Sequence, residues 1–453
     1  SKFDEHKMRE HRALFRAISK RVPIKIGNDF EIEWMHVTHS IIDSSCIAIK
    51  TAAGTMIHTG DFKIDHTPYD GFPTDIHRLA HYGEEGVLVM TSDSTNSHSP
   101  GFTKTEKAVG PTFERIFSTS TGRVIMSTFS SNIHRVAQAI EKALKHGRKI
   151  CVIGRSMEKN LDIAMTLGYI KFPKDQFIEA HEINKYTDKE VMIVTTGSQG
   201  ESMSALYRMA IHEHRHVKIK PEDQIILSAK AIPGNEGSVS QIINHLLKAG
   251  AKVAYQDYTD IHVSGHAAQE EQKLMLRLVK PKFFLPVHGE YNHALKHGET
   301  GVDCGVLERN VYVMADGEQI EVNPKYLKKV KSVKSGKVYI DNQLNHKISD
   351  DVVIDRQTMA KEGIVMIVAQ INENDRTLAT KPKVATFGFI SDKQDRFFTN
   401  EIEEILNTFL LNAKPGIFKN SRILEDELRK VVRKHCVRKY KKYPMIVPTI
   451  FVQ

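Results

Sequence analysis

Residues 123–255 alternate short apolar runs with helical patterns, and this alternation constrains the fold more than any other feature of the sequence. The apolar runs have strand length and are rich in Val and Ile; they cover 123–126, 149–153, 191–194, 224–227 and 251–255. Helical patterns at 134–145, 158–167 and 239–248 lie between them, each ended by a glycine, Gly147, Gly168 or Gly250. Such alternation is typical of α/β domains with a doubly wound parallel sheet, which we predict here.

The segments on either side have the pattern of a different sheet. Residues 45–50 and 55–59 are strand-like and are joined by a short turn that contains Gly54, as in an antiparallel pair. Residues 281–287 and 310–314 are again strand-like. We therefore predict that one sheet domain is interrupted by the inserted α/β domain.

The C-terminal part has a third pattern. A lysine-rich stretch near 325–335 is typical of a linker. Beyond it, strands at 363–368 and 443–448 bracket helices at 400–411 and 421–440, which predicts a small α+β domain. The expected bounds are 1–101 and 257–324 for the interrupted domain, 102–256 for the insertion, 325–360 for the linker and 361–453 for the last domain.

Composition and charge narrow the class of protein. No run of eighteen apolar residues occurs among the 453, and the polar opening Ser1–Lys7 lacks the apolar stretch of a secretory signal, so we expect a cytoplasmic protein without a membrane span. The four cysteines are far apart and form no C-x-x-C pair; we expect no disulfide and interpret Cys46 and Cys151 as core residues.

The net charge of +9 suits a polyanionic partner. Nine basic residues gather between 421 and 442: Arg422, Arg429, Lys430, Arg433, Lys434, Arg438, Lys439, Lys441 and Lys442. A solvated helix face and a nucleic-acid contact explain this stretch equally well.

Three strand ends carry side chains of the metal-binding type. His39 follows Val37-Thr38, Asp61 ends His58-Thr59-Gly60-Asp61, and His288 follows Pro286-Val287. Imidazole and carboxylate are ligands that zinc accepts. Each residue alone is more simply a satisfied polar group or a turn former. The histidines at 212, 214 and 216 are likewise more simply a solvated turn than a metal-binding tract.

Four loops follow strands of the predicted parallel sheet, at 128–132, 154–156, 196–200 and 232–238, and all are small, polar or glycine-rich. Ligands bind at the carboxyl ends of such sheets, and helix N-termini there offer amide donors to phosphate. N-capping explains any single loop. Four loops at one edge favour an anion site.

The metal-type strand ends resemble the metallo-β-lactamase superfamily, in which T-H-S and H-T-G-D elements follow an H-x-H-x-D-H signature. Further motifs occur in the order found in the ribonuclease J family of its β-CASP branch, and the likeness runs from near residue 1 to residue 453. These motifs are Thr91–Asn96, Ser130–Arg135, Gly154–Glu158, Thr196–Glu201, Ile232–Asn235, Asp260–His266 and His288–Tyr291.

The resemblance implies a metallo-β-lactamase αββα sandwich, an inserted β-CASP domain and a C-terminal α+β domain that supports a homodimer or homotetramer. It implies two divalent ions, zinc or else manganese, with His39 and His288 as terminal ligands and Asp61 as the bridging carboxylate. Asp93 matches an acidic motif beside the metals. His266 matches a histidine motif that binds the scissile phosphate or assists the leaving group.

The family acts on single-stranded RNA in RNA decay and processing, as a 5′-to-3′ exonuclease that prefers 5′-monophosphate ends and as an endonuclease. By motif, Ser198, Gln199, Gly234, Ser264 and His266 lie near that phosphate, with Arg155 on the RNA path. RNA-decay or ribosome-associated proteins are further expected partners. His262 either orients this network or caps the strand before it.

The sequence departs from the family in one respect. These 453 residues contain no H-x-H-x-D-H, which in the family precedes the region matching Ser1, and Ser1–His6 resembles a stretch beyond it. We expect roughly a hundred residues upstream to supply the other ligands, and we expect this chain alone to be inactive. Two alternatives stay open: an RNA-binding or assembly module, and a metallo-hydrolase of small esters, against which the phosphate-lined insertion argues.

Overall fold

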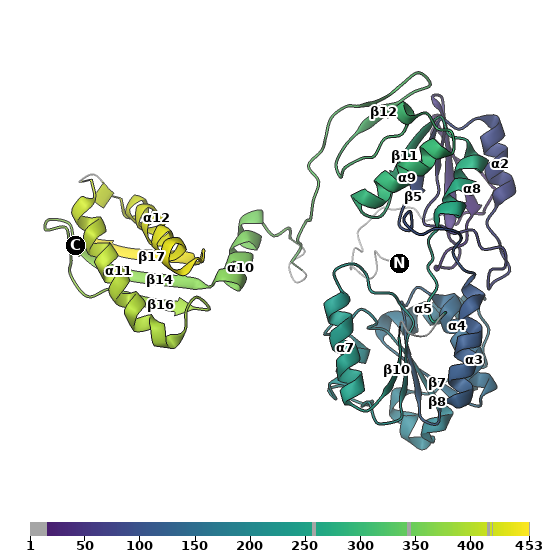
Figure 1. The fold of residues 1–453 in the computed structure, drawn as a ribbon, viewed down its shortest axis with the longest axis horizontal. Coiled ribbons are helices and arrows are strands. Elements are labelled where there is room, and N and C mark those ends of the chain that lie inside the picture. The colour runs from purple at the N-terminus through teal and green to yellow at the C-terminus, as the bar shows by residue number, and fades with distance from the viewer. Residues whose placement is uncertain (1–15, 256–259, 342–345, 415–416, 419, 453) are drawn as a thin grey trace. The chain divides into compact units, whose positions relative to one another are not determined.

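The computed structural model describes residues 16–255, 260–341, 346–414, 417–418 and 420–452. The chain forms two compact units, 1–334 and 335–453, and we describe each by itself (Figure 1). The opening Ser1–His6 and the expected boundary between residues 256 and 257 lie outside the described residues.

The first unit contains a six-stranded sheet in the order β1-β2-β3-β4-β5-β11. Its strands are β1 (Ile24–Ile26), β2 (Phe30–His36), β3 (Ser45–Thr51), β4 (Gly54–His58), β5 (Val89–Asp93) and β11 (Phe283–Val287). Strands β1 to β4 pair antiparallel, and β4, β5 and β11 pair parallel. Because β5 and β11 are neighbours although the whole insertion separates them in sequence, the predicted interruption is confirmed.

Three helices accompany this sheet: α2 (Ile76–Glu85), α8 (Gln269–Val279) and α9 (Tyr291–Asp303). Alternate strand residues such as Met35, Cys46 and Ile57 are fully buried in a core with Leu79 of α2 and Met275 of α8. This alternation is the period-2 pattern of a sheet with one buried face.

The insertion has the predicted parallel sheet, in the order β10-β9-β6-β8-β7. Its strands are β6 (Val124–Ser127), β7 (Lys149–Ile153), β8 (Val191–Thr195), β9 (Gln224–Leu227) and β10 (Lys252–Ala254). Helices α3 (Val109–Thr119), α4 (Ile133–Lys145) and α5 (Arg155–Thr166) share one core with the sheet, and α6 (Ala205–Ala210) and α7 (Glu236–Lys248) share another (Figure 1). The expected helix-ending glycines Gly147, Gly168 and Gly250 have φ of 70°, 78° and 86°.

Four 3₁₀ turns complete the insertion and its approach: η1 (Glu106–Ala108), η2 (Lys174–Gln176), η3 (Ala180–Lys185) and η4 (Asp188–Glu190). The turn η1 lies where the chain leaves the six-stranded sheet for the insertion.

The strand predicted at 310–314 is wrong. The structure has a 3₁₀ turn, η5 (Glu308–Asn310), followed by a single bridge between Val311 and Phe284. The next strands, β12 (Ile320–Val322) and β13 (Leu327–Lys329), form a small hairpin. The segment expected as a linker, 325–360, therefore contains β13 and most of a helix, α10 (Asp350–Glu362), so it is not irregular throughout.

In the second unit, β14 (Ile364–Asn372) is central. It pairs antiparallel with β15 (Thr377–Leu378) and β16 (Lys383–Phe387) and parallel with β17 (Met445–Val452). Helices α11 (Asp392–Asn412) and α12 (Ser421–Tyr440) share a core with one face of this sheet. The predicted α+β character is present, although α11 begins eight residues before the predicted helix.

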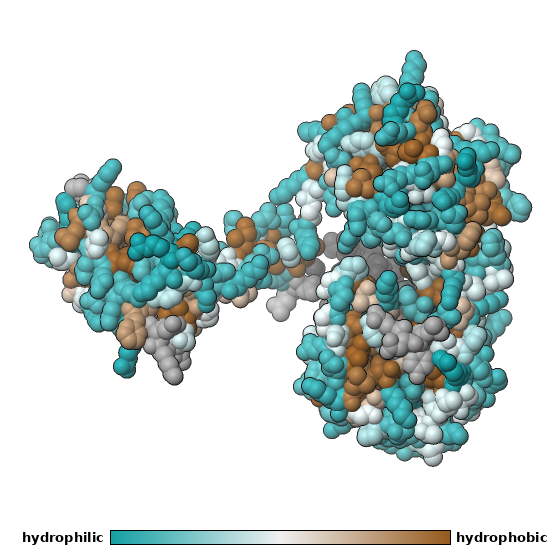
Figure 2. Space-filling model, in the orientation of Figure 1, coloured by the Kyte–Doolittle hydropathy of each residue, from teal (hydrophilic) through white to brown (hydrophobic). Residues whose placement is uncertain are grey.

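The cysteines and the surface agree with the composition. Cys46 and Cys151 are buried, as predicted, and all four cysteines are free. In the part of the chain that the structure describes, no helix has the length and apolar character needed to cross a membrane. The visible surface is largely hydrophilic, with separate apolar patches (Figure 2).

Candidate metal centre

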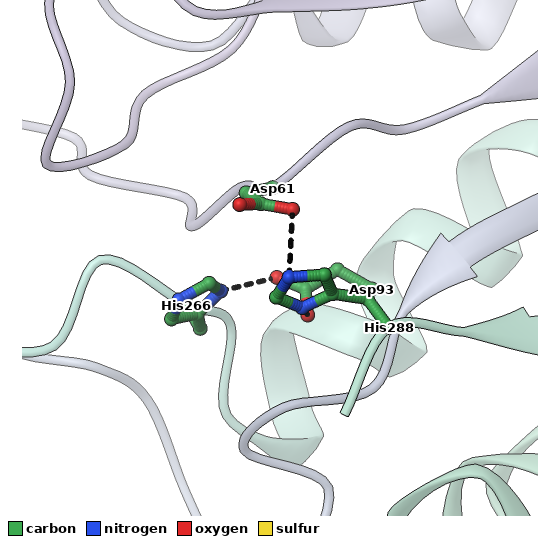
Figure 3. A group of neighbouring side chains, drawn as sticks. All are labelled: Asp61, Asp93, His266 and His288. Carbon is green, nitrogen blue, oxygen red and sulfur yellow. Dashed lines mark hydrogen bonds and ion pairs between the residues drawn. The ribbon is translucent and has the colours of Figure 1, made fainter. Parts of the chain in front are cut away.

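Four side chains from distant parts of the sequence meet at one edge of the six-stranded sheet. Asp61, Asp93, His266 and His288 each offer a ligand atom, and these atoms all lie within 4.8 Å of one another (Figure 3). Asp61 follows β4, Asp93 ends β5 and His288 follows β11. The cluster forms here because β4, β5 and β11 are adjacent parallel strands whose carboxyl ends meet at one edge.

His39 lies beside this cluster. It comes shortly after β2, its Nε2 is 3.9 Å from Asp61 Oδ2, and its ring centroid is 4.9 Å from that of His266. Its Nδ1 lies 2.8 Å from the carbonyl oxygen of Gly265, which can only accept. Nδ1 therefore carries the hydrogen, and Nε2 keeps its lone pair.

Asp93 orients two further imidazoles. His266 Nδ1 lies 2.7 Å from Asp93 Oδ2 and donates to it. Asp93 Oδ1 accepts from the Thr95 hydroxyl at 2.7 Å, so this hydroxyl accepts from His288 Nδ1, also at 2.7 Å; the same Nδ1 lies 3.3 Å from Asp93 Oδ1 and shares its hydrogen with it. Both imidazoles thus carry hydrogen on Nδ1, and their Nε2 atoms are free to act as ligands or bases.

The local charges agree with this arrangement. Burial opposes ionisation of Asp93, but the hydrogen bonds from His266 and His288 outweigh it and hold the pKa of Asp93 well below its usual range. The hydrogen bond with Asp93 raises the pKa of His288, whereas burial lowers the pKa of His39. The site therefore combines an ionised, buried carboxylate with a neutral imidazole.

The backbone is unusual where the ligand-type residues sit. His288 has a φ of 58°, a left-handed conformation that is uncommon for a residue other than glycine. A Cβ on Gly265 would lie 2.7 Å from the His39 ring, so only glycine permits this close approach. The segment that carries His39 and the segment that carries Gly265 therefore pack in direct contact, with no room for a side chain at position 265.

The donor set fits a divalent ion. Three imidazoles have Nδ1 engaged by oxygen acceptors, which leaves the lone pair on Nε2 for a ligand bond, the usual arrangement of metal-binding histidines. Nε2 of His39 also lies 3.3 Å from the Ser40 hydroxyl, which can donate to it. The Asp61 carboxylate is 3.7 Å from His288 Nε2 and 3.9 Å from His39 Nε2, and both distances exceed a hydrogen bond. Nitrogen and carboxylate ligands of this kind suit zinc and manganese.

The residues expected near RNA form two groups. Gln199 holds the 230–235 loop, because its Nε2 donates to Lys230 O at 3.1 Å and its Oε1 accepts from Ile232 N at 2.8 Å. Buried Ser198 precedes it. Gly234 lies in the same loop with a φ of 94°, and Glu236 accepts from its amide.

Ser264 lies beside the metal cluster instead, since its hydroxyl accepts from Asn96 Nδ2 at 2.8 Å and from His266 N at 3.2 Å. Arg155 is an exposed residue at the start of α5. No contact known for the described residues joins Arg155 to either group.

Three neighbours were not singled out from the sequence. Thr95 relays the hydrogen bond between His288 and Asp93, and Asn96 and Thr103 hold the carbonyl of His266 at 2.8 Å and 2.7 Å. Thr95 and Asn96 lie in the same motif as Asp93, so their position in that motif could have pointed to them as site residues. Thr103 had no such signal.

Other histidines behave differently from the cluster. His262 Nδ1 lies 2.7 Å from Nη1 of Arg135, a contact that suits the expected role of His262 in orienting the neighbouring network. His214 is buried rather than solvated, and its Nδ1 accepts the backbone hydrogen of Val217 at 3.1 Å. Within the described residues, the histidines at 212, 214 and 216 form no metal-type cluster.

Known families match three stretches of the chain. Residues 121–246 match "Ribonuclease J, beta-CASP domain", residues 250–313 match "Zn-dependent metallo-hydrolase RNA specificity domain", and residues 351–452 match "Ribonuclease J C-terminal domain". Asp61 and Asp93 precede the matched stretches, whereas His266 and His288 lie within the second.

Whole proteins of this family are similar along almost the entire chain. Ribonuclease J of Helicobacter pylori is 57% identical over 447 residues, 99% of this chain and 64% of that protein, so the chain spans less than two thirds of this relative. Ribonuclease J 1 of Streptococcus pyogenes is 37% identical over 99% of this chain and 80% of that protein. Ribonuclease J of Thermus thermophilus is 35% identical over 99% of this chain and 77% of that protein. The chain therefore belongs to the ribonuclease J family.

Proposed function

We propose that this protein is a metal-dependent ribonuclease that degrades single-stranded RNA from 5′-monophosphate ends in the 5′-to-3′ direction, and also cleaves it internally, in RNA decay and processing. One observation carries the proposal. Three imidazoles with hydrogen-bonded Nδ1 atoms, and with the lone pair on Nε2, surround the Asp61 carboxylate in a chain of the ribonuclease J family.

The proposed metal ligands are His39, Asp61 and His288, with Asp61 between the two histidines. Two ions would need further ligands besides these three, of the kind that the H-x-H-x-D-H signature supplies in the family. Two zinc or manganese ions would supply charge for the phosphate oxygens and activate the attacking water. Buried Asp93 orients the imidazoles of His266 and His288 and adds negative charge at the site.

His266 is the proposed group for phosphate binding or leaving-group assistance. Its Nδ1 hydrogen is held by Asp93, so its Nε2 faces the reaction as the atom that accepts or donates a proton. Its side chain is 21% exposed, whereas that of Asp93 is 1% exposed. Substrate therefore reaches the histidine and not the carboxylate behind it.

The inserted domain is the proposed binding site for the 5′ phosphate. Ser198 and Gly234 lie in loops joined by Gln199, at the carboxyl edge of a parallel sheet. Ser264, whose hydroxyl accepts from the His266 amide, would lie near the same phosphate, and Arg155 would line the RNA path. A phosphate at Gly234 would compete with Glu236 for the backbone amide.

The decisive experiment compares RNAs that differ only at the 5′ end. The native-length protein with zinc or manganese should shorten 5′-monophosphate RNA faster than 5′-triphosphate RNA. His288→Ala should abolish cleavage, while His81→Ala, on the exposed side of α2, should leave it unchanged. Absence of RNA cleavage, or full activity of His288→Ala, would reject the proposal.

Two structural expectations accompany this function. Ile32, Trp34, Ile47, Ile49 and Met56 form a half-buried apolar face of the six-stranded sheet, which supports an αββα sandwich with a second sheet on that face. The domain bounds 1–101, 102–256, 257–324, 325–360 and 361–453 remain our prediction. The expected partners are single-stranded RNA, further copies of the chain, and RNA-decay or ribosome-associated proteins.

Self-association would use the second unit. Its sheet has helices in the core of one face only, and the opposite face exposes Met366, Val368, Phe387 and Phe451. Contiguous exposed apolar residues of this kind commonly mark interfaces. We infer that this open sheet face packs against a second copy.

A further inference from the structure

Arg135, in the first turn of α4, is completely buried, and each of its five N–H donors has an acceptor. Nε and one Nη donate to the two oxygens of Glu106 at 2.8 and 2.9 Å. The other three hydrogens reach Ser228 O at 3.1 Å, His262 Nδ1 at 2.7 Å and Val263 O at 2.8 Å. No other side chain type could serve these acceptors together.

Three of these four acceptor residues, Glu106, His262 and Val263, lie on the two chain segments that connect the six-stranded sheet with the insertion, and Ser228 follows β9 of the insertion. Glu106 lies in η1 on the outgoing segment, while His262 and Val263 lie on the returning segment. The backbone N of Glu106 also donates to Asp65 Oδ2 at 3.0 Å, and Asp65 N donates to Thr38 Oγ1 at 3.1 Å. One buried network thus reaches the residue before His39.

The returning segment leads directly into the metal cluster. Gly265 O accepts from His39, and His266 donates to Asp93. These residues come two and three positions after Val263, whose carbonyl Arg135 holds. A shift of the backbone at 262–263 would therefore move both groups relative to the cluster.

We propose that Arg135 is a positioning residue, which holds the 262–266 segment so that His266 faces Asp93 and Gly265 O receives His39. This inference rests on the proposed function. Replacing a buried ion pair by apolar residues often leaves stability unchanged or raises it, so stability alone does not account for the pair. The position of Arg135 and Glu106, at both chain connections between the six-stranded sheet and the insertion, does account for the pair.

The chain offers a matched control in a second buried arginine–carboxylate pair. Arg123 donates to the two oxygens of Asp223 at 2.9 and 2.6 Å, and the side chains are 4% and 1% exposed. These residues immediately precede β6 and β9, at the amino edge of the parallel sheet. This pair is therefore equally buried but lies at the opposite edge from the active-site loops.

The experiment compares Arg135→Met/Glu106→Gln with Arg123→Met/Asp223→Asn in the native-length protein, with cleavage of 5′-monophosphate RNA and backbone hydrogen exchange as readouts. The first double variant should lose kcat by roughly tenfold to a hundredfold, as an ångström-scale displacement does, with a smaller change in KM. Its amides at 262–268 should exchange faster. The second double variant should keep kcat and the exchange of 262–268.

Arg135→Lys is a second variant that tests the proposal even if the double variant fails to fold. It keeps the charge beside Glu106 but has fewer hydrogen-bond donors. It should fold and show an intermediate kcat. If the wild-type protein cleaves RNA but the Arg135 variants match the control pair in kcat and exchange, the inference is overturned. If the wild-type protein does not cleave RNA, the proposed function fails, and unchanged exchange at 262–268 would separately reject the positioning role.

Discussion

Asp93 shows how one buried residue sets the chemistry of its neighbours. Its two oxygens receive hydrogen bonds from His266 and Thr95, and Thr95 in turn receives one from His288. The sequence motif predicts an acidic residue beside the metals, but it does not predict which imidazole nitrogen carries hydrogen. Only the positions of the acceptors determine that.

Asp93→Asn should lower the affinity for zinc or manganese roughly tenfold or more, because outer ligands of metal-binding histidines contribute on that scale. An amide cannot accept on both atoms as the carboxylate does. Isothermal titration of the native-length protein with each metal measures the change. Asp75→Asn is the matched control, since Asp75 caps α2 and pairs with the exposed Arg21 but is not one of the clustered residues, and asparagine caps helices equally well. Equal affinity in wild type and Asp93→Asn would contradict this role.

His297 predicts a pH dependence of stability. The ring is fully buried, its Nδ1 lies 3.0 Å from Ser94 Oγ, and burial lowers its pKa to about 3. Between pH 6.5, near the unfolded value, and pH 3, the unfolded chain binds a proton that the folded chain does not. Stability is therefore lost as the pH falls, by up to about 1.4 kcal/mol per pH unit from this group.

The measurement is the urea-unfolding free energy of the first unit between pH 7 and 4.5, in wild type and His297→Phe. The phenyl ring preserves the packing against Phe284 but does not titrate. The variant should lose stability less steeply below pH 6.5. Parallel pH curves for the two proteins would show that His297 does not contribute.

Among the helices and strands, the crossing of α2 and α8 depends on one small residue. A Cβ on Gly83 of α2 would lie 1.9 Å from Leu278 O of α8. Gly83→Ala should therefore force the helices apart and destabilise the first unit by roughly 1–3 kcal/mol, as overpacking does. Gly237→Ala in α7 is the control, because its Cβ would meet nothing within 4 Å.

Thermal unfolding distinguishes these two variants. Gly237→Ala should unfold at the same temperature as wild type or higher, since alanine favours a helix more than glycine does. Gly83→Ala should unfold at a lower temperature. Equal melting temperatures for the two variants would refute close packing at Gly83.

Element prediction succeeded where periodicity and caps agreed. The strands at 149–153 and 224–227 have the predicted bounds, and helix 421–440 is also unchanged. The strand at 310–314 failed because only Val311 finds a partner; β propensity without a neighbouring strand does not make a strand. Helices α5 and α7 begin three residues early because their first turns are polar, outside the apolar periodicity.

At the scale of the whole molecule, the sequence predicted which residues gather but not how they are held. His39, Asp61 and His288 stood at strand ends, and parallel strands bring such ends together. The Arg135 network escaped prediction because three of its five acceptors, on Ser228, His262 and Val263, lie more than 90 residues away in sequence. No local pattern encodes contacts of that kind.

The second unit allows the proposed self-association to be tested. Phe387 and Phe451 are 60% and 57% exposed on the open sheet face, where they flank the exposed Met366 and Val368 of β14. Covering this face with a second copy would remove apolar area from water and favour assembly. Phe387→Lys/Phe451→Lys should therefore shift the native-length protein towards monomer in sedimentation velocity. Leu411→Lys, an equally exposed apolar site on α11, should leave the assembly unchanged. A wild-type monomer, or an unaltered oligomer in the double variant, would exclude this face as the interface.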